Sequence, residues 1–191
     1  MKYVKVVDGT KSNAGEFEYK IGVVNIAEIW DSKANNPKEM GGFNFSTEEK
    51  ILRWIHRGNT VYDVEIPRDA EVIDCQSSNC PHGVFRTNRI ILSNPQKVTE
   101  EMVMDYYRKS DLPIKTYYQC IVVMIYKNCL NIAQEIIKDK VNKNNIDDCI
   151  NEFERMISDK HDGSTPIFKY DDLWQEAKEI YNILVNIKNA K

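Results

Sequence analysis

Hydrophobic and polar residues alternate along much of the first half of the chain, with the two-residue period typical of β-strands. Turns rich in glycine, asparagine and proline separate the alternating segments, because these residues break regular structure. Strands are predicted at residues 3–7, 17–22, 41–46, 60–67, 70–75 and 84–92. The apolar run at residues 23–31 fits either a short strand or a short helix.

One segment of this half changes to the period of a helix. Residues 46–58 read STEEKILRWIHRG, with apolar positions three and four apart after a polar start. Ser46 or Thr47 suits the N-cap, Glu48 and Glu49 suit the positive end of the helix dipole, and Gly58 suits the stop. We therefore predict a single capped helix between two strands.

The second half has helical periodicity throughout. Helices are predicted at residues 99–110, from 113 to about 141, at 144–158 and at 171–187. The middle of the second helix, QCIVVMIY, is apolar on every side, which is typical of a central buried helix. The hydrophobic pattern changes from the period of strands to the period of helices at SNPQKV, residues 93–98.

These patterns predict an α+β fold. A small mixed or antiparallel sheet with one capped helix forms a domain at residues 1–97, and an all-helical part of about four helices forms a second domain at residues 98–191.

The composition narrows the function classes. The chain has 191 residues and a net charge of −3, and its first 97 residues carry equal numbers of basic and acidic side chains. A general nucleic-acid-binding protein needs a basic excess, so such binding, which would use Arg53, Arg57, Arg86 and Arg89, is the least favoured reading. No apolar run is long enough to cross a membrane and no signal peptide is evident, so we expect a cytoplasmic protein.

The five cysteines are widely spaced, which favours free thiols in a reducing compartment. Cys75, Cys80 and His82 lie within eight residues as C-x4-C-x-H. A zinc site needs four ligands, usually as two tight pairs, and no second pair exists. We expect a polar loop and no metal, and leave open whether these three residues bind anything.

The order of motifs in the first half resembles the core of the ADP-ribosyltransferases of the arginine–serine–glutamate class. The chain shows YVKVV near its start, F-x-S-T at residues 45–47 leading into a helix, VYDVEIPRDAEVI at 61–73, and VFRTNRIIL at 84–92. It is also similar to uncharacterised phage- or plasmid-associated proteins that begin with YKV and carry G-F-x-F before a helix.

The resemblance implies NAD as cofactor and assigns a role to four positions. Lys5 lies near the place of the family's first-strand arginine, which binds NAD. Ser46 and Thr47, preceded by Phe45, match the first two letters of the S-T-S motif, and Glu48 replaces the third. Lys5, Phe45, Ser46 and Thr47 are thus the candidate cofactor-binding residues.

The family's catalytic glutamate has no counterpart at the expected place. Asn88 stands where the E-x-E element falls, and Asn lacks the charge that stabilises an oxocarbenium ion. Glu65 substitutes only if the strands bring it to the same cleft, so Glu65 and Asn88 are the candidate catalytic residues. We predict an NAD-binding mono-ADP-ribosyltransferase-like protein, active or degenerate. The alternative is a non-catalytic protein-interaction module of a mobile-element defence or counter-defence system, and both readings imply a protein target or partner.

Overall fold

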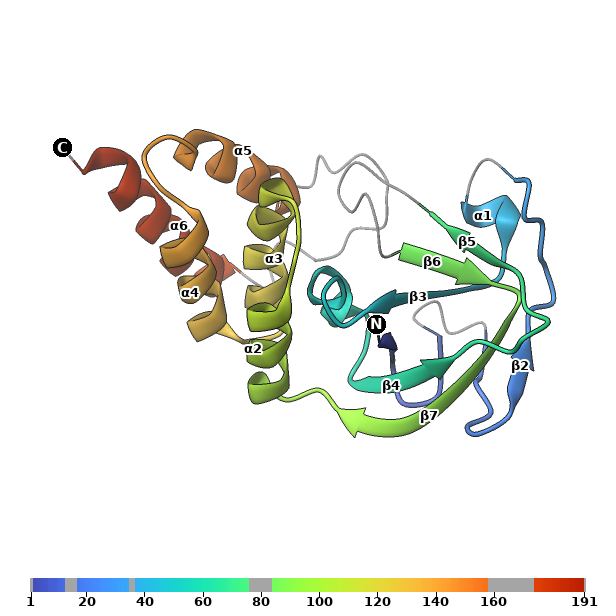
Figure 1. Ribbon diagram of the computed structural model, residues 1–191. Coiled ribbons are helices and arrows are strands. Elements are labelled where there is room, and N and C mark those ends of the chain that lie inside the picture. Colours follow the sequence, from blue (N-terminus) through green and yellow to red (C-terminus); the bar gives the residue numbers. More distant parts are fainter. Residues whose placement is uncertain (1, 13–16, 35–36, 76–83, 158–173, 191) are drawn as a thin grey trace. The chain divides into compact units, whose positions relative to one another are not determined.

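The computed structural model describes residues 2–12, 17–34, 37–75, 84–157 and 174–190. The chain divides into two compact units, Met1–Asp111 and Leu112–Lys191. The strands lie in the first unit, and the described part of the second unit is helical (Figure 1). The predicted α+β fold with a helical C-terminal part is confirmed.

Seven strands of the first unit form one sheet, in which every pairing is antiparallel. Across the sheet the strands follow the order β2-β7-β4-β1-β3-β6-β5. Their bounds are β1 Tyr3–Val7, β2 Val24–Ile26, β3 Phe43–Thr47, β4 Thr60–Glu65, β5 Val72–Asp74, β6 Val84–Thr87 and β7 Arg89–Lys97.

The sheet is strongly curled. Asn88 alone separates β6 from β7 along the chain, yet β4, β1 and β3 lie between them in the sheet. Because consecutive Cα atoms are only about 3.8 Å apart, the two ends of this five-strand stretch must come close together. Figure 1 shows β7 continuing from the end of β6 and bending around to run beside β4. The long strand predicted at residues 84–92 is therefore two strands joined at a sharp corner.

One apolar core cluster of the first unit lies on the sheet face that carries Val7, because side chains alternate between the two faces of a strand. The buried core cluster consists of Val7, Tyr19, Phe43, Phe45, Tyr62, Ile90 and Leu92. Aromatic rings dominate it: Phe45 stacks on Phe85 with centroids 5.3 Å apart, and Tyr3 meets Phe45 edge-on at 5.1 Å.

The helix of the first half differs from the prediction. It is a 3-10 helix, η1, from Ile51 to Arg57, and its N-cap position Lys50 makes no side-chain capping bond. Ser46 and Thr47 belong to β3 instead of capping the helix. Ladder bonds with β1 and β6 hold these two residues extended, and this pairing outweighs their capping preference. Gly58 ends η1 where a Cβ atom would lie 2.1 Å from the carbonyl oxygen of Val7.

Two smaller elements also differ. The strand predicted at 17–22 is reduced to an isolated bridge between Lys11 and Glu18. A single helical turn, α1 (Pro37–Met40), stands in what the pattern predicts as a loop. The first unit ends with α2 (Glu100–Lys109), whose N-cap Thr99 accepts a hydrogen bond from the Met102 amide.

The described part of the second unit holds four helices: α3 Ile114–Tyr126, α4 Leu130–Lys140, α5 Ile146–Ile157 and α6 Trp174–Asn189. The long helix predicted from 113 to about 141 is broken between α3 and α4, where Asn128 has a φ of 55°. The centre of α3 is buried on all sides, as its apolar sequence predicts. Among the described residues, no helix is long and apolar enough to cross a bilayer.

Candidate functional site

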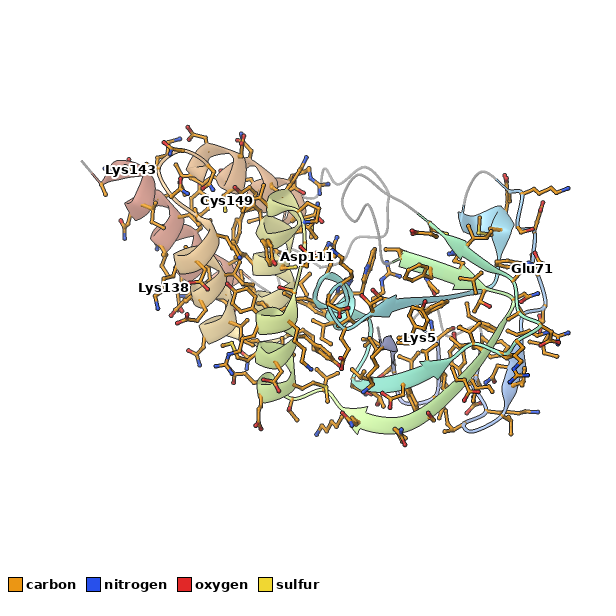
Figure 2. The ribbon with its side chains drawn as sticks, in the orientation of Figure 1. Lys5, Glu71, Asp111, Lys138, Lys143 and Cys149 are labelled. Atoms are coloured by element: carbon orange, nitrogen blue, oxygen red, sulfur yellow. The ribbon has the colours of Figure 1, made fainter. Side chains whose placement is uncertain are left out.

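A buried lysine lies in the middle of the curled sheet. Lys5 is the central residue of β1 and is only 7% exposed. Alternation along the strand places its side chain on the core face with Tyr3 and Val7, and in register it stands opposite Tyr62 of β4. Figure 2 labels Lys5 among the strands of the first unit.

The ammonium of Lys5 lies where β1 and β3 separate. The ladder between these strands holds two residue pairs, Tyr3 with Thr47 and Val4 with Ser46, and stops before Lys5. Lys5 Nζ donates to the backbone oxygen of Asn44 at 2.5 Å and lies 3.4 Å from Asn44 Oδ1. The ring centroid of Tyr19 is 5.3 Å from the same nitrogen. The ammonium thus occupies a place that strand pairing leaves vacant.

The electrostatic surroundings of Lys5 disfavour its charge. Burial, together with the nearby positive charges of Arg57 and Arg86, lowers the pKa of Lys5 from 10.5 to about 7. Removing an ammonium from water penalises its charged form, and like charges add to that penalty. A lysine with this pKa is about half neutral near pH 7.

Arg86 belongs to β6, and alternation places its side chain with that of Asn44 on the sheet face opposite to that of Lys5. Its strand position pairs with Asn44 in the β3–β6 ladder, so it is the cross-strand neighbour of the residue that receives Lys5. Its guanidinium donates to the backbone oxygen of Gly41. Burial lowers the pKa of Arg86, and the nearby Cys75 thiol acts in the opposite direction.

Arg57 approaches from the end of η1, the helix that packs on β1. Its Cζ atom lies 4.8 Å from the centroid of the Trp54 ring, and Arg53 approaches the same ring at 5.3 Å. Burial and the charge of Arg86 lower the pKa of Arg57. Among the described residues, the buried Nε of Arg57 and the buried indole Nε1 of Trp54 find no hydrogen-bond acceptor.

Lys5, Arg57 and Arg86, together with Trp54, form what we call the cation cluster. Its three basic side chains come from β1, η1 and β6, and the positive charges of Arg57 and Arg86 lower the pKa of Lys5. Buried donors that lack acceptors cost free energy, and a negatively charged ligand with several acceptor oxygens would satisfy both needs. The arrangement is therefore suited to holding an oxyanion such as a phosphate group.

The structure separates the cofactor-binding residues that the resemblance names. Phe45 and Thr47 share the core face with Lys5, whereas Ser46 shares the opposite face with Val4. Phe45 is packed among aromatic rings, and Ser46 and Thr47 are 2% and 3% exposed. Lys5 thus lies with Phe45 and Thr47, and Ser46 points away from it.

The two candidate catalytic residues lie at separate places. Glu65 is the exposed last residue of β4 and stands beside Ile91 of β7. Asn88 occupies the corner between β6 and β7, where its Oδ1 accepts from the Glu71 amide at 2.9 Å. Its backbone oxygen accepts from the Ala27 amide. Asn88 therefore anchors two loops at the corner of the sheet.

The cysteine–histidine segment is only partly described. Cys75 is a free, half-buried thiol whose Sγ lies 3.9 Å from the sulfur of Met40, and burial raises its pKa. Cys80 and His82 lie outside the described residues. Within the described ranges, no group of three or more His, Cys, Asp or Glu side chains could hold a metal ion.

From the sequence, Arg57 and Arg86 are candidates only for nucleic-acid binding and are not connected with Lys5. Arg57 and Arg86 belong to the cluster, whereas Arg89 pairs with Asp69. The one signal in the sequence is a cation within a strand whose other residues are apolar, as Lys5 is within YVKVV. Which cations meet it depends on strand order.

No family model, curated protein or solved structure matches the chain. The resemblance to ADP-ribosyltransferases therefore stays a prediction.

Proposed function

We propose that the first unit binds NAD and that the chain is a catalytically degenerate ADP-ribosyltransferase-like protein. The observation that carries the proposal is the cation cluster, in which the charges acting on buried Lys5 are the positive charges of Arg57 and Arg86. The pyrophosphate of NAD has two negative charges and several acceptor oxygens, which complement such a cluster. The resemblance supplies the identity of the dinucleotide, and the cluster supplies the reason for binding.

Weak or absent catalysis follows from the position of the carboxylates. When ADP-ribose is transferred, the bond to nicotinamide breaks and positive charge develops on the ribose. A carboxylate held against that charge lowers the barrier. Glu65 lies exposed at the end of β4 and the side chain of Asn88 is engaged with Glu71, which favours binding without rapid transfer.

Titration calorimetry of the full chain with NAD tests this proposal, with Arg86→Gln as the disruptive variant. Loss of one charge-assisted hydrogen bond, about 1.5–3 kcal/mol, weakens binding by about tenfold or more. Arg68→Gln is the matched control, because Arg68 is an exposed arginine of the same unit. Saturable NAD binding that Arg86→Gln weakens and Arg68→Gln preserves would support the proposal. No binding at millimolar NAD, or equal binding by all three proteins, would refute it.

A second candidate, the protein-interaction module, is favoured by one separate observation. Aliphatic side chains are exposed on and beside the edge strand β2, where Val24, Ile26 and Ile29 are 43%, 58% and 66% exposed. Exposed apolar side chains at a sheet edge are typical of a surface that another chain covers. A partner captured by the wild-type chain and lost with Ile26→Lys, with no NAD-dependent gain in the partner's mass, would favour this function. Equal capture by both chains would count against it.

A further inference from the structure

One edge of the sheet in the first unit is open. β2 is the first strand in the order across the sheet and pairs with β7 alone. Figure 1 shows β2 at the outer border of this unit. Among the described residues, no strand lies on its other side. The backbone N–H and C=O groups along such an edge can accept a further strand.

The register with β7 shows which residues of β2 present these groups. The Ala27 amide donates to the Asn88 oxygen at 2.9 Å, one position beyond the last pair of the ladder. Hydrogen-bonded positions alternate along an antiparallel ladder, so Asn25 also bonds to β7. Val24 and Ile26 take the other positions. Their backbone N–H and C=O groups therefore point toward the open edge.

The side chains on and beside β2 are apolar and exposed. Of the eight large hydrophobic side chains that are exposed in the described parts of the chain, five lie close together in the sequence: Ile21, Val23, Val24, Ile26 and Ile29. Proteins usually protect a strand edge from pairing by a charged side chain or a proline, and residues 21–27 contain neither. The open edge is therefore suited to pairing with another strand.

The opposite edge of the sheet is built differently. β5 pairs with β6, and the Cys75 amide donates to the Val84 oxygen at 2.7 Å just beyond the strand. The same alternation directs the backbone groups of Val72 and Asp74 outward, and Asp74 is exposed and charged. A charge on an edge strand opposes the addition of another strand. Edge pairing is therefore favoured at β2 and opposed at β5.

A second copy of the chain fits the β2 edge. If two β2 strands pair antiparallel about a two-fold axis at Asn25, Val24 of each copy stands opposite Ile26 of the other. Both residues direct their backbone groups outward, so this register forms two hydrogen-bonded pairs. The side chain of Asn25 stays buried, where it bonds to both backbone groups of Lys20 at 2.8 and 2.9 Å. The interface is self-complementary, as two-fold symmetry requires.

The charges that flank β2 complement each other in this arrangement. Lys20 and Glu28 are the nearest charged residues before and after the strand, and both are exposed. Neither side chain forms an ion pair with a described residue. Antiparallel pairing brings the Lys20 end of each strand to the Glu28 end of the other, whereas parallel pairing would bring like charges together. Charge therefore favours an antiparallel second copy.

We infer that the chain self-associates through β2, as a two-fold dimer in which two seven-stranded sheets join edge to edge. A stable interface buries about 800 Å² on each partner, which is more than five partly exposed aliphatic side chains supply. We therefore expect a reversible dimer that forms as the concentration rises. The inference names a second copy as the partner of the proposed interaction module, so it rests on that second candidate function and not on NAD binding.

Sedimentation velocity of the full chain, from micromolar to submillimolar concentration, measures the association. We expect the wild type to shift from monomer to dimer, and Ile26→Lys, which places a charge on the open edge, to stay monomeric. Val72→Lys is the matched control because it puts the same charge on the other edge strand, and we expect it to dimerise as the wild type does. Both side chains are exposed, so neither substitution disturbs the core.

Two charge reversals test the direction of pairing. Lys20→Glu or Glu28→Lys places like charges together at both ends of the interface, and we expect each to weaken the dimer by about three- to tenfold. The double variant Lys20→Glu/Glu28→Lys restores opposite charges, and we expect it to recover most of the wild-type affinity. Such recovery is specific to an antiparallel pair of identical strands.

The outcomes separate this inference from the proposed functions. A wild type that stays monomeric, or a dimer that Ile26→Lys leaves intact, overturns the inference. A double variant as weak as the single reversals also overturns it. If the wild type is monomeric but captures a different protein through Ile26, the inference fails and the interaction module stands. NAD binding is measured in a separate titration, so its outcome bears on neither result.

Discussion

Lys5 in the first unit and Glu152 in the second are both buried ionisable side chains, and their surroundings differ in opposite ways. In the second unit, Glu152 on α5 accepts from Gln119 at 2.7 Å and from Arg155 at 2.5 Å, and Lys115 lies 3.7 Å away. In the first unit, Lys5 has two acceptors on one residue, and the charges that lower its pKa are cations.

The pKa shifts express this difference. Burial alone would raise the pKa of Glu152, but the hydrogen bonds from Arg155 and Gln119 and the charges of Arg155 and Lys115 outweigh it and lower the pKa. At Lys5, burial and like charge act together. A buried charge with its own partners is a structural feature, whereas one that lacks them is suited to receiving a ligand.

The largest effect is expected from Glu152→Ala, which removes the buried carboxylate together with its hydrogen bonds. It removes the carboxylate that accepts a hydrogen bond from the fully buried Gln119 amide. We expect the free energy of unfolding of the second unit to fall by about 2–4 kcal/mol. Hydrogen exchange of the slowest α5 amides measures it, with Glu135→Ala as the control because Glu135 is a half-exposed glutamate on α4. A loss no larger than that of the control would show that Glu152 is not structurally important.

The second effect has the opposite sign. Lys5→Met replaces a poorly compensated ammonium by an apolar side chain of similar length, which suits the surrounding aromatic core. We expect the free energy of unfolding of the first unit to rise by about 1–3 kcal/mol near neutral pH, while anion binding is lost. Hydrogen exchange of the slowest β1 and β4 amides measures the change. Destabilisation by Lys5→Met would mean that Lys5 supports the fold.

The third effect is the pH dependence of that gain. The pKa of Lys5 is lowered from 10.5 to about 7 in the folded chain, so the unfolded chain binds the extra proton between these values. The wild type must therefore gain stability relative to Lys5→Met as the pH rises through this window, by at most about 1.4 kcal/mol per pH unit. Denaturation of both proteins at several pH values measures it, and a constant difference between them would contradict the lowered pKa.

The smallest effect is expected for Lys115, whose exposed side chain lies beside the buried Glu152. The Lys115 side chain is 63% exposed and its nitrogen lies 3.7 Å from Glu152, so water screens the pair. We expect Lys115→Gln to lower the free energy of unfolding by less than about 1 kcal/mol. Chemical denaturation of Lys115→Gln beside Glu152→Ala checks it. An equal loss of unfolding free energy in the two variants would show that Lys115 supplies most of the stabilisation of the buried Glu152 carboxylate.

The predictable part of the fold is the part that local pattern controls. Alternation located most of the strands, and helical spacing located α2, α5 and α6. The misses arose where tertiary pairing competes with local preference. Ser46 and Thr47 are good helix caps, but β1 and β6 hold them in a strand. The corner at Asn88 and the break at Asn128 carry no proline or glycine to mark them.

The candidate site was less predictable than the fold because it depends on strand order. The sequence indicates that Lys5 is a cation on an otherwise apolar strand face. It does not indicate that β3 and β6 follow β1 across the sheet, which brings Asn44 to Lys5 and pairs Arg86 with Asn44. Nor does it indicate that η1 returns Arg57 to the same place, because that depends on how the helix packs on β1.

One measurement tests the central claim most directly: the pKa of the Lys5 side chain, followed by NMR with selectively labelled lysine, without and with NAD. The Lys5 signal is assigned by its loss in Lys5→Met. We predict a pKa of about 7 in the free chain and a clear rise when NAD is bound. A value near 10.5 in the free chain, or one that NAD leaves unchanged, would contradict the account of Lys5 as a buried cation suited to an anion.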